Sequence, residues 1–208
     1  MNEVLIPYVT PDLVLNKNIA LVGSSGQLKE QHYGEAIDSF DEVARFNRAP
    51  TSGYEAMVGE KTTIRVVNNH VFNNNDISHE GYTDQPKDFV KNMRDSKILY
   101  FAEDLAPYWS RNSNTHESNE VYLFQYSAME FLKKTFSFGS NKNLTLGLGF
   151  ICTLIISDIK PTLFGFDIED RPRDHYWEDR PLPSEYHGIS AEKQLLNLLK
   201  DNNLLTII

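Results

Sequence analysis

Short runs of apolar, β-branched and aromatic residues recur along this chain, and polar turns or segments with helical spacing separate them. These runs predict strands at residues 18–23, 42–46, 62–67, 97–102, 161–166 and 204–208. Apolar positions at helical spacing predict helices at residues 27–37, 86–93, 121–134, 147–156 and 190–200. The alternation indicates an α/β fold with an open, mostly parallel twisted sheet flanked by helices, in which ligands bind beyond the carboxyl ends of the strands.

Length and composition are those of one folded domain, and we expect a single domain over residues 1–208. Hydrophobic residues make up 40% of the chain, but no run reaches the roughly 18 apolar residues of a membrane span. Charged residues and prolines within the first twenty positions do not fit a secretory signal, so we expect a cytoplasmic protein. The one cysteine, Cys152, lies in an apolar run and is predicted to be a buried hydrophobe rather than a nucleophile.

The formal net charge of −9 disfavours nucleic acid as a partner, because binding to its phosphates needs clustered lysine and arginine. An anionic ligand must therefore be held locally, by backbone amides, helix N-termini or a few basic side chains. Four arginines are candidates for contact with a phosphate or carboxylate, although a surface ion pair is an equally good interpretation of each. They are Arg45, Arg48, Arg171 and Arg173.

A glycine turn, Gly23-Ser24-Ser25-Gly26, follows the first predicted strand directly and precedes a predicted helix. Its backbone N–H groups and the helix N-terminus would suit a phosphate. The turn lacks the third glycine of dinucleotide-binding loops, the lysine of a P-loop and the G-x-S-x-G order of a hydrolase elbow. Taken alone, it is better explained as a plain structural turn.

Two histidines, His175 and His187, lie in the polar, aromatic-rich segment that follows the strand at 161–166. One imidazole can remove a proton from a hydroxyl while the other supports a leaving phosphate, and a surface or hydrogen-bonding role is the alternative. Asp167 and Glu169 resemble the acidic pair that binds a divalent metal in many enzymes. No second carboxylate cluster accompanies them, so we predict no metal site.

Several ordered motifs accompany these residues. Residues 20–65 contain the glycine turn, Tyr33-Gly34, Ile37-Asp38-Ser39, Arg45-x-Asn47-x-Ala49-Pro50-Thr51 and Val58-Gly59-x-Lys61-Thr62-Thr63. This pattern resembles the large sialyl motif of the animal-type sialyltransferases, glycosyltransferase family 29. Residues 144–167 resemble the family's small motif, His175-Tyr176-Trp177-Glu178 its third motif, and His187 with Glu192 its very small motif. All four occur in family order.

The resemblance implies a Rossmann-like fold of the GT-A type and an enzyme that needs neither metal nor cofactor. Such an enzyme transfers sialic acid from its co-substrate CMP-sialic acid to a hydroxyl of a glycan acceptor and inverts the anomeric centre. It further implies that His187 is the general base and that His175 binds the CMP phosphate. The residues implied in binding the CMP part of the donor are Gly23, Ser24, Ser25, Asn47, Thr145, Leu146, Gly147, Gly165 and Phe166.

Four positions depart from the family pattern. Ser24 replaces an asparagine at the phosphate turn and Leu146 replaces a threonine, which changes the donor contacts expected at both positions. Ile19 and Asp158 occupy the places of the two cysteines that link the large and small motifs, so that disulfide is absent. Its absence fits a compact bacterial or viral-like member that works in the cytoplasm.

Two alternatives stay open at this point. A transferase of Kdo or another 3-deoxy-ulosonic acid would use a CMP donor with the same nucleotide and carboxylate. A non-catalytic homologue would bind CMP without turnover, although the two retained histidines favour catalysis. We expect a capsular or lipopolysaccharide glycan as the acceptor, and a lipid-linked acceptor would place the protein peripherally at the inner face of the membrane.

Overall fold

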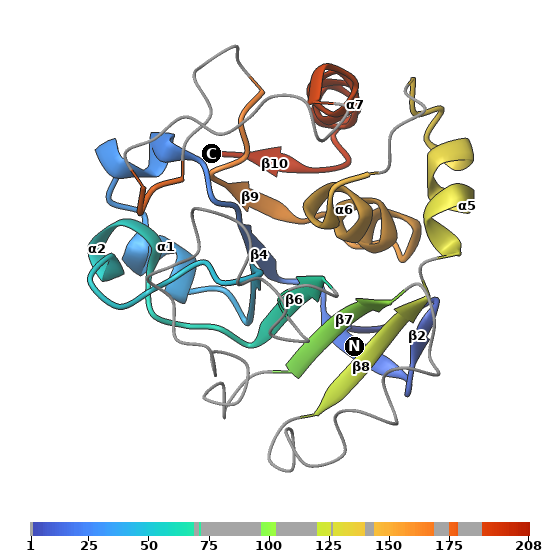
Figure 1. Ribbon diagram of the computed structural model, residues 1–208, viewed down its shortest axis with the longest axis horizontal. Helices are drawn as coiled ribbons and strands as arrows, with labels where there is room; N and C mark the ends of the chain where they lie inside the picture. The colour runs from blue at the N-terminus through green and yellow to red at the C-terminus, as the bar shows by residue number, and fades with distance from the viewer. Residues whose placement is uncertain are drawn as a thin grey trace.

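An eight-stranded sheet lies at the centre of the described residues (Figure 1). The computed structural model describes residues 2–68, 71, 97–102, 120–125, 127–139, 144–168, 175–178 and 189–208. The sheet strands are β2 (Val9–Thr10), β4 (Ile19–Val22), β5 (Glu42–Phe46), β6 (Ile64–Asn68), β7 (Lys97–Ala102), β8 (Val121–Gln125), β9 (Thr162–Phe164) and β10 (Thr206–Ile207). Their order is β10-β9-β4-β5-β6-β7-β8-β2, and every neighbouring pair is parallel except β8 with β2. The predicted α/β fold with a mostly parallel sheet is therefore confirmed.

Helices cover both faces of the sheet (Figure 1). They are the 3-10 helix η1 (Gly26–Glu30), α1 (Gly34–Asp38), α2 (Glu55–Val58), α5 (Ala128–Thr135), α6 (Leu146–Ile156) and α7 (Ile189–Asp201). Strand β4 shows the two faces, because Leu21 belongs to the core that contains the buried residues of α5, α6 and α7. Its neighbour Val22 belongs to a second core, with the buried residues of η1, α1 and α2. A strand buried on both faces has a continuous apolar sequence, which is why it could be predicted.

Two predicted helices differ from the structure. The first half of the predicted helix at 121–134 is strand β8, because pairing with β7 on one side and β2 on the other outweighs helical spacing. The predicted helix at 27–37 is divided into η1 and α1. Gly34, at the start of α1, lies so close to α2 that a Cβ atom would stand 2.1 Å from the Glu55 carbonyl oxygen. The absence of a side chain at Gly34 lets α1 pack directly against α2. The helix predicted at 86–93 lies outside the described residues.

A hairpin of β1 (Glu3–Ile6) and β3 (Leu13–Asn16) precedes the sheet and was not anticipated from the sequence. Its inward side chains Ile6, Leu13 and Leu15 are almost fully buried and belong to the core with α6. Prolines and charged residues interrupt the apolar pattern of this segment, so the hairpin is recognised by its burial against the core.

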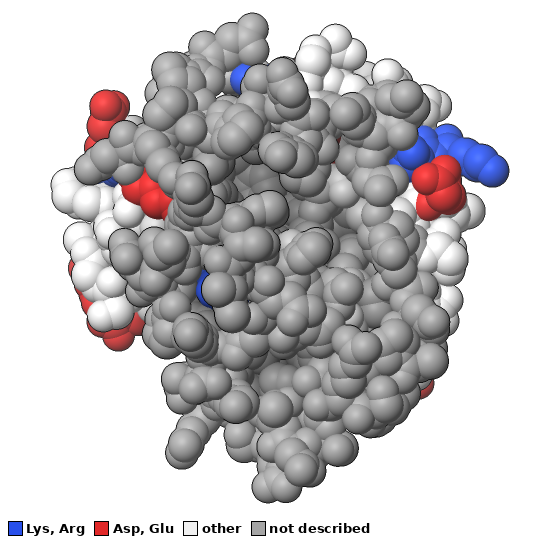
Figure 2. Space-filling model, in the orientation of Figure 1, with Lys and Arg blue, Asp and Glu red and all other residues white. Residues whose placement is uncertain are grey.

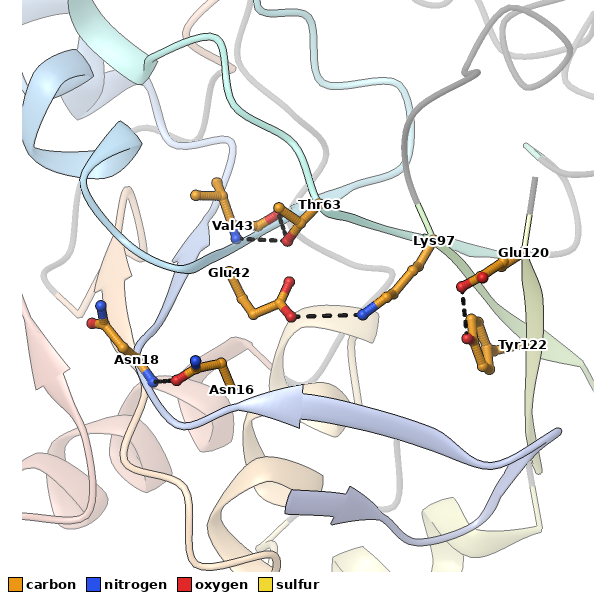
Figure 3. A network of polar contacts seen from close by, with 8 residues as sticks. All are labelled: Asn16, Asn18, Glu42, Val43, Thr63, Lys97, Glu120 and Tyr122. Carbon is orange, nitrogen blue, oxygen red and sulfur yellow. Dashed lines mark hydrogen bonds and ion pairs between the residues drawn. The ribbon is translucent and has the colours of Figure 1, made fainter. Parts of the chain in front are cut away.

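Polar contacts join the sheet edge at which the parallel strands begin (Figure 3). Lys97, the first residue of β7, forms an ion pair with Glu42, the first residue of β5, at 3.6 Å. The Val43 N–H donates to Thr63 Oγ1 at 2.9 Å, and the Tyr122 hydroxyl donates to the Glu120 carboxylate at 2.9 Å. The Val43–Thr63 bond joins β5 to the start of β6, the Lys97–Glu42 pair joins β7 to β5, and the Tyr122–Glu120 bond is local to β8. The opposite edge, where the strands end, is the place to look for a ligand site.

The described charged side chains visible in Figure 2 lie mainly along the rim of this face. Acidic side chains lie along the rim where Figure 1 shows α1 and α2. At the place of α5, basic and acidic side chains adjoin, and this helix carries an ion pair between Lys133 and Glu130 at 3.0 Å. Among the described side chains on this face, no basic patch that would suit nucleic acid is visible.

Candidate functional site

The strand order reverses between β4 and β9, and the candidate site lies at that point. From β4 the chain adds β5, β6, β7 and β8 on one side, then returns to add β9 and β10 on the other side. Crevices for ligands form at such reversals, beyond the carboxyl ends of the strands. The glycine turn follows β4 here, and Gly165 and Phe166 follow β9. The fold therefore brings two segments that are far apart in sequence to one edge.

The turn after β4 packs directly against the turn after β9. The Gly23 N–H donates to the Phe164 carbonyl at 2.7 Å, and the Ser25 N–H donates to the Gly165 carbonyl at 3.3 Å. A Cβ atom on Gly23 would lie 2.3 Å from the Gly165 carbonyl oxygen, so no side chain fits. Gly165 has a φ of +70°, in the left-handed region that favours glycine. Both glycines are thus required for the packing of the two turns.

The serines of the turn have different surroundings. Ser25 is the N-cap of η1, and its Oγ accepts a hydrogen bond from the Gln27 N–H at 3.2 Å. The Ser24 carbonyl accepts the Tyr176 N–H at 3.0 Å. Within the described part of the chain, no acceptor is found for the Ser24 N–H, so this backbone donor is available to a ligand. The backbone N–H of residue 24 can donate to a ligand whether the residue is serine, as here, or asparagine, as in the family pattern.

His175 lies beside the glycine turn, where its backbone forms an isolated antiparallel bridge with Ser25. Its Nδ1 is 3.2 Å from a carboxylate oxygen of Glu178, and its ring stacks on the Trp177 indole at a centroid distance of 4.3 Å. A carboxylate can only accept here, so Nδ1 carries the proton in this contact. The carboxylate and the indole together fix the orientation of the imidazole.

Several residues that support His175 were not predicted as site residues. Trp177 Nε1 donates to Glu178 at 3.2 Å, and the Lys29 ammonium donates to the Glu178 carbonyl at 2.6 Å. The Tyr176 hydroxyl donates to the Pro50 carbonyl, which ties this segment to the loop after β5. The sequence gives one indication of this support, because Glu178 follows His175 by three residues and can therefore contact it. The contact of Lys29 from η1 is evident only in the folded structure.

The N-terminus of α6 reaches the same edge of the sheet. A Cβ atom on Gly147 would lie 3.0 Å from the Phe166 ring, and that ring makes an edge-on contact with Phe46 at a centroid distance of 5.9 Å. Thr145 is the N-cap of α6, and its Oγ1 accepts the Leu148 N–H at 3.2 Å. Leu146 and Gly147 form the first turn of this helix and are half-buried.

Glu192 of α7 holds this end of α6. Its carboxylate accepts the Thr145 N–H at 2.6 Å and the Thr145 hydroxyl at 3.1 Å. A carboxylate is well placed there, because the N-terminus of a helix carries partial positive charge. Glu192 thereby attaches α7 to the segment that the family resemblance assigns to the nucleotide.

Replacing Glu192 with alanine is expected to lower the free energy of unfolding by about 2 kcal/mol, because two charge-assisted hydrogen bonds to Thr145 are lost. Glu192→Gln keeps an acceptor and should lose less. Urea unfolding measures both, with Glu130→Ala as the control, because the contact of Glu130 within the described residues is an exposed ion pair with Lys133 on α5. Equal effects of the Glu192→Ala and Glu130→Ala substitutions would show that the cap carries no stability.

Asn47 directly follows β5 and has a left-handed conformation with a φ of +47°. Its N–H donates to the Val66 carbonyl at 2.8 Å, and its Oδ1 accepts the Asn68 N–H at 3.2 Å. Because Oδ1 is engaged by a donor, the side-chain group left for a ligand is the amide Nδ2. Asn47 can therefore act as a hydrogen-bond donor at the carboxyl edge of the sheet.

The interpretation of Arg45 and Arg48 as surface residues is wrong, since they are 0% and 5% exposed. Arg45 does not reach the candidate site as a ligand group either. Its guanidinium donates to the carbonyls of Val58, Gly59 and Lys61, which follow or end α2. Burial lowers the pKa of Arg45 to about 10, which leaves it charged at neutral pH. Its role is to stabilise the end of a short helix.

Cys152 is fully buried in α6, as predicted, and burial raises the pKa of its thiol to about 12. His187, Glu169, Arg171 and Arg173 lie outside the described residues. Over the described ranges, no group of three or more His, Cys, Asp or Glu side chains is arranged to hold a metal ion. The same ranges contain no helix with the length and apolar character of a membrane crossing.

The sequence profile of glycosyltransferase family 29 (sialyltransferase) matches residues 16–204, nearly the whole chain. The chain belongs to glycosyltransferase family 29. One relative of this family 29 protein is CMP-N-acetylneuraminate-beta-galactosamide-alpha-2,3-sialyltransferase 1 of Sus scrofa. The two sequences are 28% identical in an alignment that covers 97% of this chain and 60% of the relative. Beta-galactoside alpha-2,6-sialyltransferase 2 of Homo sapiens is 41% identical over 52% of the chain and 18% of the relative. The chain thus spans 60% of the length of the first relative and much less of the second.

Solved structures of sialyltransferases share the fold of this family 29 protein. A crystal structure of a mammalian sialyltransferase aligns with a TM-score of 0.67 at 25% identity, over 91% of this chain and 68% of that one. A crystal structure of a mammalian sialyltransferase in complex with Gal-beta-1-3GalNAc-ortho-nitrophenol aligns with a TM-score of 0.66 at 23% identity. The second likeness bears on the fold alone.

Proposed function

We propose that this protein is an inverting, metal-independent sialyltransferase that transfers sialic acid from CMP-sialic acid to a hydroxyl of a glycan acceptor. The observation that carries the proposal is the meeting of the glycine turn, the first turn of α6, Phe166 and His175 at the strand-order reversal. Family membership supports the reaction class. We assign the resembling segments as the family's four sialyl motifs and the fold as a single-domain, Rossmann-like GT-A variant.

In this proposal the CMP part of the donor lies along the carboxyl edge of β4, β5 and β9. The Ser24 N–H and Asn47 Nδ2 supply hydrogen-bond donors, and Gly147 with Phe166 forms an apolar wall for the base and ribose. In its doubly protonated form, His175 keeps Nδ1–H on Glu178 and donates from Nε2 to the phosphate, which stabilises the charge that develops there.

The proposed reaction is a single displacement. The acceptor oxygen attacks the anomeric carbon from the face opposite the phosphate, and the bond from that carbon to the phosphate oxygen breaks. CMP leaves with the bonding electron pair, and His187 takes the acceptor's hydroxyl proton. Because CMP is already a good leaving group, positioning and phosphate stabilisation supply most of the rate, and no metal is required.

The two alternative functions are less well supported. The relatives of this chain are named as sialyltransferases, and none of those described above is named for Kdo, so sialic acid is the favoured sugar. A purely CMP-binding homologue would not need the carboxylate and indole that orient His175. A capsular or lipopolysaccharide acceptor and a cytoplasmic location, with peripheral contact at the inner membrane face, stay predictions from the sequence.

The proposal is tested by incubating the protein with CMP-N-acetylneuraminate and Gal-beta-1-3GalNAc-ortho-nitrophenol, a glycan present in one structural relative. We expect release of CMP and a product heavier by one sialyl residue, at the same rate in EDTA. Parallel reactions use CMP-Kdo and other β-galactosides. Transfer of Kdo alone would favour that alternative, and CMP binding by calorimetry with no transfer or donor hydrolysis would favour a non-catalytic homologue.

A further inference from the structure

Arg48 is a buried arginine whose charge is not matched by the protein around it. The side chain is 5% exposed, and its Nε is buried without a hydrogen-bond partner. Within the described residues, Arg48 takes part in no ion pair. Buried charges in folded proteins are almost always paired or fully hydrogen-bonded, because removing an ion from water is costly. This residue therefore needs an explanation beyond packing.

The other two buried arginines of the same region have clear structural partners. Arg45 donates to three backbone carbonyls at the end of α2, as described above. Arg65, on β6, donates to the Ala49 carbonyl at 2.9 Å and to the Asn47 carbonyl at 3.4 Å. These two guanidinium groups hold the chain in place. Each of them also has one buried nitrogen with no hydrogen-bond partner, Arg45 Nη1 and Arg65 Nε. Arg48 differs because, within the described residues, its side chain makes no hydrogen bond at all, so a structural role like theirs does not account for it.

The position of Arg48 places it at the candidate site. It directly follows Asn47, at the carboxyl end of β5, and β5 is the hydrogen-bonded neighbour of β4. The carbonyls on either side of Arg48 are the two that Arg65 binds. The loop is further fixed by the Tyr176 hydroxyl on the Pro50 carbonyl, next to His175. Arg48 therefore lies in a hydrogen-bonded stretch of backbone, directly after the proposed donor-binding residue Asn47.

We propose that Arg48 binds an anionic group of the CMP-sugar donor, either the phosphate of CMP or the carboxylate of the sugar. The inference rests on the proposed function and adds a residue to it. Arg48 stands at a position of the large motif that the family pattern leaves open, Asn47-x-Ala49, so it is a feature of this chain. The protein has a net charge of −9, which repels a doubly anionic donor. A positive side chain at the site would offset this repulsion locally.

If Arg48 binds the donor, one substitution should raise the stability of the ligand-free protein and weaken anion binding. Arg48→Met replaces the unmatched charge with an apolar chain of similar reach, so the melting temperature of the ligand-free protein should rise by about 3 to 8 °C. The same variant should bind its anion about 10- to 100-fold more weakly, because a charged hydrogen-bond donor is lost. An arginine with a purely structural role would give a lower melting temperature on removal.

The binding experiment separates the two anions. Calorimetry with cytidine and with CMP, and the KM for CMP-N-acetylneuraminate, are measured for wild type, Arg48→Met and Arg48→Lys. Contact with the phosphate predicts weaker binding of CMP and unchanged binding of cytidine. Contact with the sugar carboxylate predicts unchanged binding of both and a raised KM for the donor. Arg48→Lys keeps the charge and should recover part of the loss.

Lys17→Met is the matched control, because it removes one positive charge from an exposed ion pair with Asp158 before β4 begins. It should change neither CMP affinity nor donor KM by more than about twofold. The proposal is overturned if Arg48→Met keeps wild-type CMP affinity and donor KM, or if its melting temperature falls. A wild-type protein that binds neither CMP nor donor would instead contradict the proposed function.

Discussion

Replacing His187 with alanine is expected to lower turnover by about 10² to 10⁴-fold, the usual contribution of a general base. In the proposed reaction this imidazole accepts the acceptor's hydroxyl proton as the new glycosidic bond forms. CMP does not take part in that proton transfer, so its affinity should change by no more than about twofold. The loss should therefore appear in kcat far more than in donor binding.

The measurement is the initial rate of sialyl transfer at saturating donor, together with calorimetry of CMP binding. His32→Ala serves as the control, because His32 is exposed and is not one of the proposed site residues. We expect the control to keep wild-type kinetics. Near-normal turnover of His187→Ala would refute the role of His187 as the base while leaving the donor site untouched.

Replacing Gly23 with alanine is expected to lower the free energy of unfolding by about 3 kcal/mol and to remove measurable CMP binding. The added Cβ atom would stand 2.3 Å from the Gly165 carbonyl oxygen, and backbone on both sides leaves little freedom to move. The turns after β4 and β9 must then separate. That separation displaces the Ser24 N–H, and with it the backbone of His175, which bridges Ser25.

Urea unfolding and CMP calorimetry on the same preparation test this expectation. Gly139→Ala is the matched control, because a Cβ atom on Gly139 meets nothing within 4 Å and should leave both measurements unchanged. Comparable stability of the two variants would contradict the close packing of the turns. A destabilised Gly23→Ala protein with normal CMP affinity would instead separate the turn from the ligand site.

The sequence by itself determined the central strands and their order along the chain. Strands β4, β5 and β7 were predicted within one or two residues. Strand β4 is apolar at every position because both of its faces are buried, whereas β5 and β7 are mostly apolar runs that also contain Glu42, Arg45 and Lys97. Helix α6 was predicted for the same reason, since its seven buried residues leave almost no polar face. The glycine turn was also recognisable, because few residues tolerate such close backbone contact.

Only the tertiary structure decided the elements whose local signals are weak or mixed. Strand β8 has apolar residues at helical spacing and became a strand through its two neighbours in the sheet. The β1–β3 hairpin is defined by burial against the core rather than by its own sequence. In each case, long-range pairing contributes more free energy than local propensity, which spans only about 1 kcal/mol.

The candidate site divides in the same way. The residue types at the glycine turn, the start of α6 and His175 were evident from the sequence, and their ordered motifs indicated the family. Their meeting at one edge, the contact of Glu192 with Thr145 and the unmatched burial of Arg48 were decided by the fold. The burial and the partners of a side chain depend on residues that are far away in the sequence. A sequence pattern can therefore indicate that a charged residue is a candidate for the site, but it cannot show whether another group neutralises the charge.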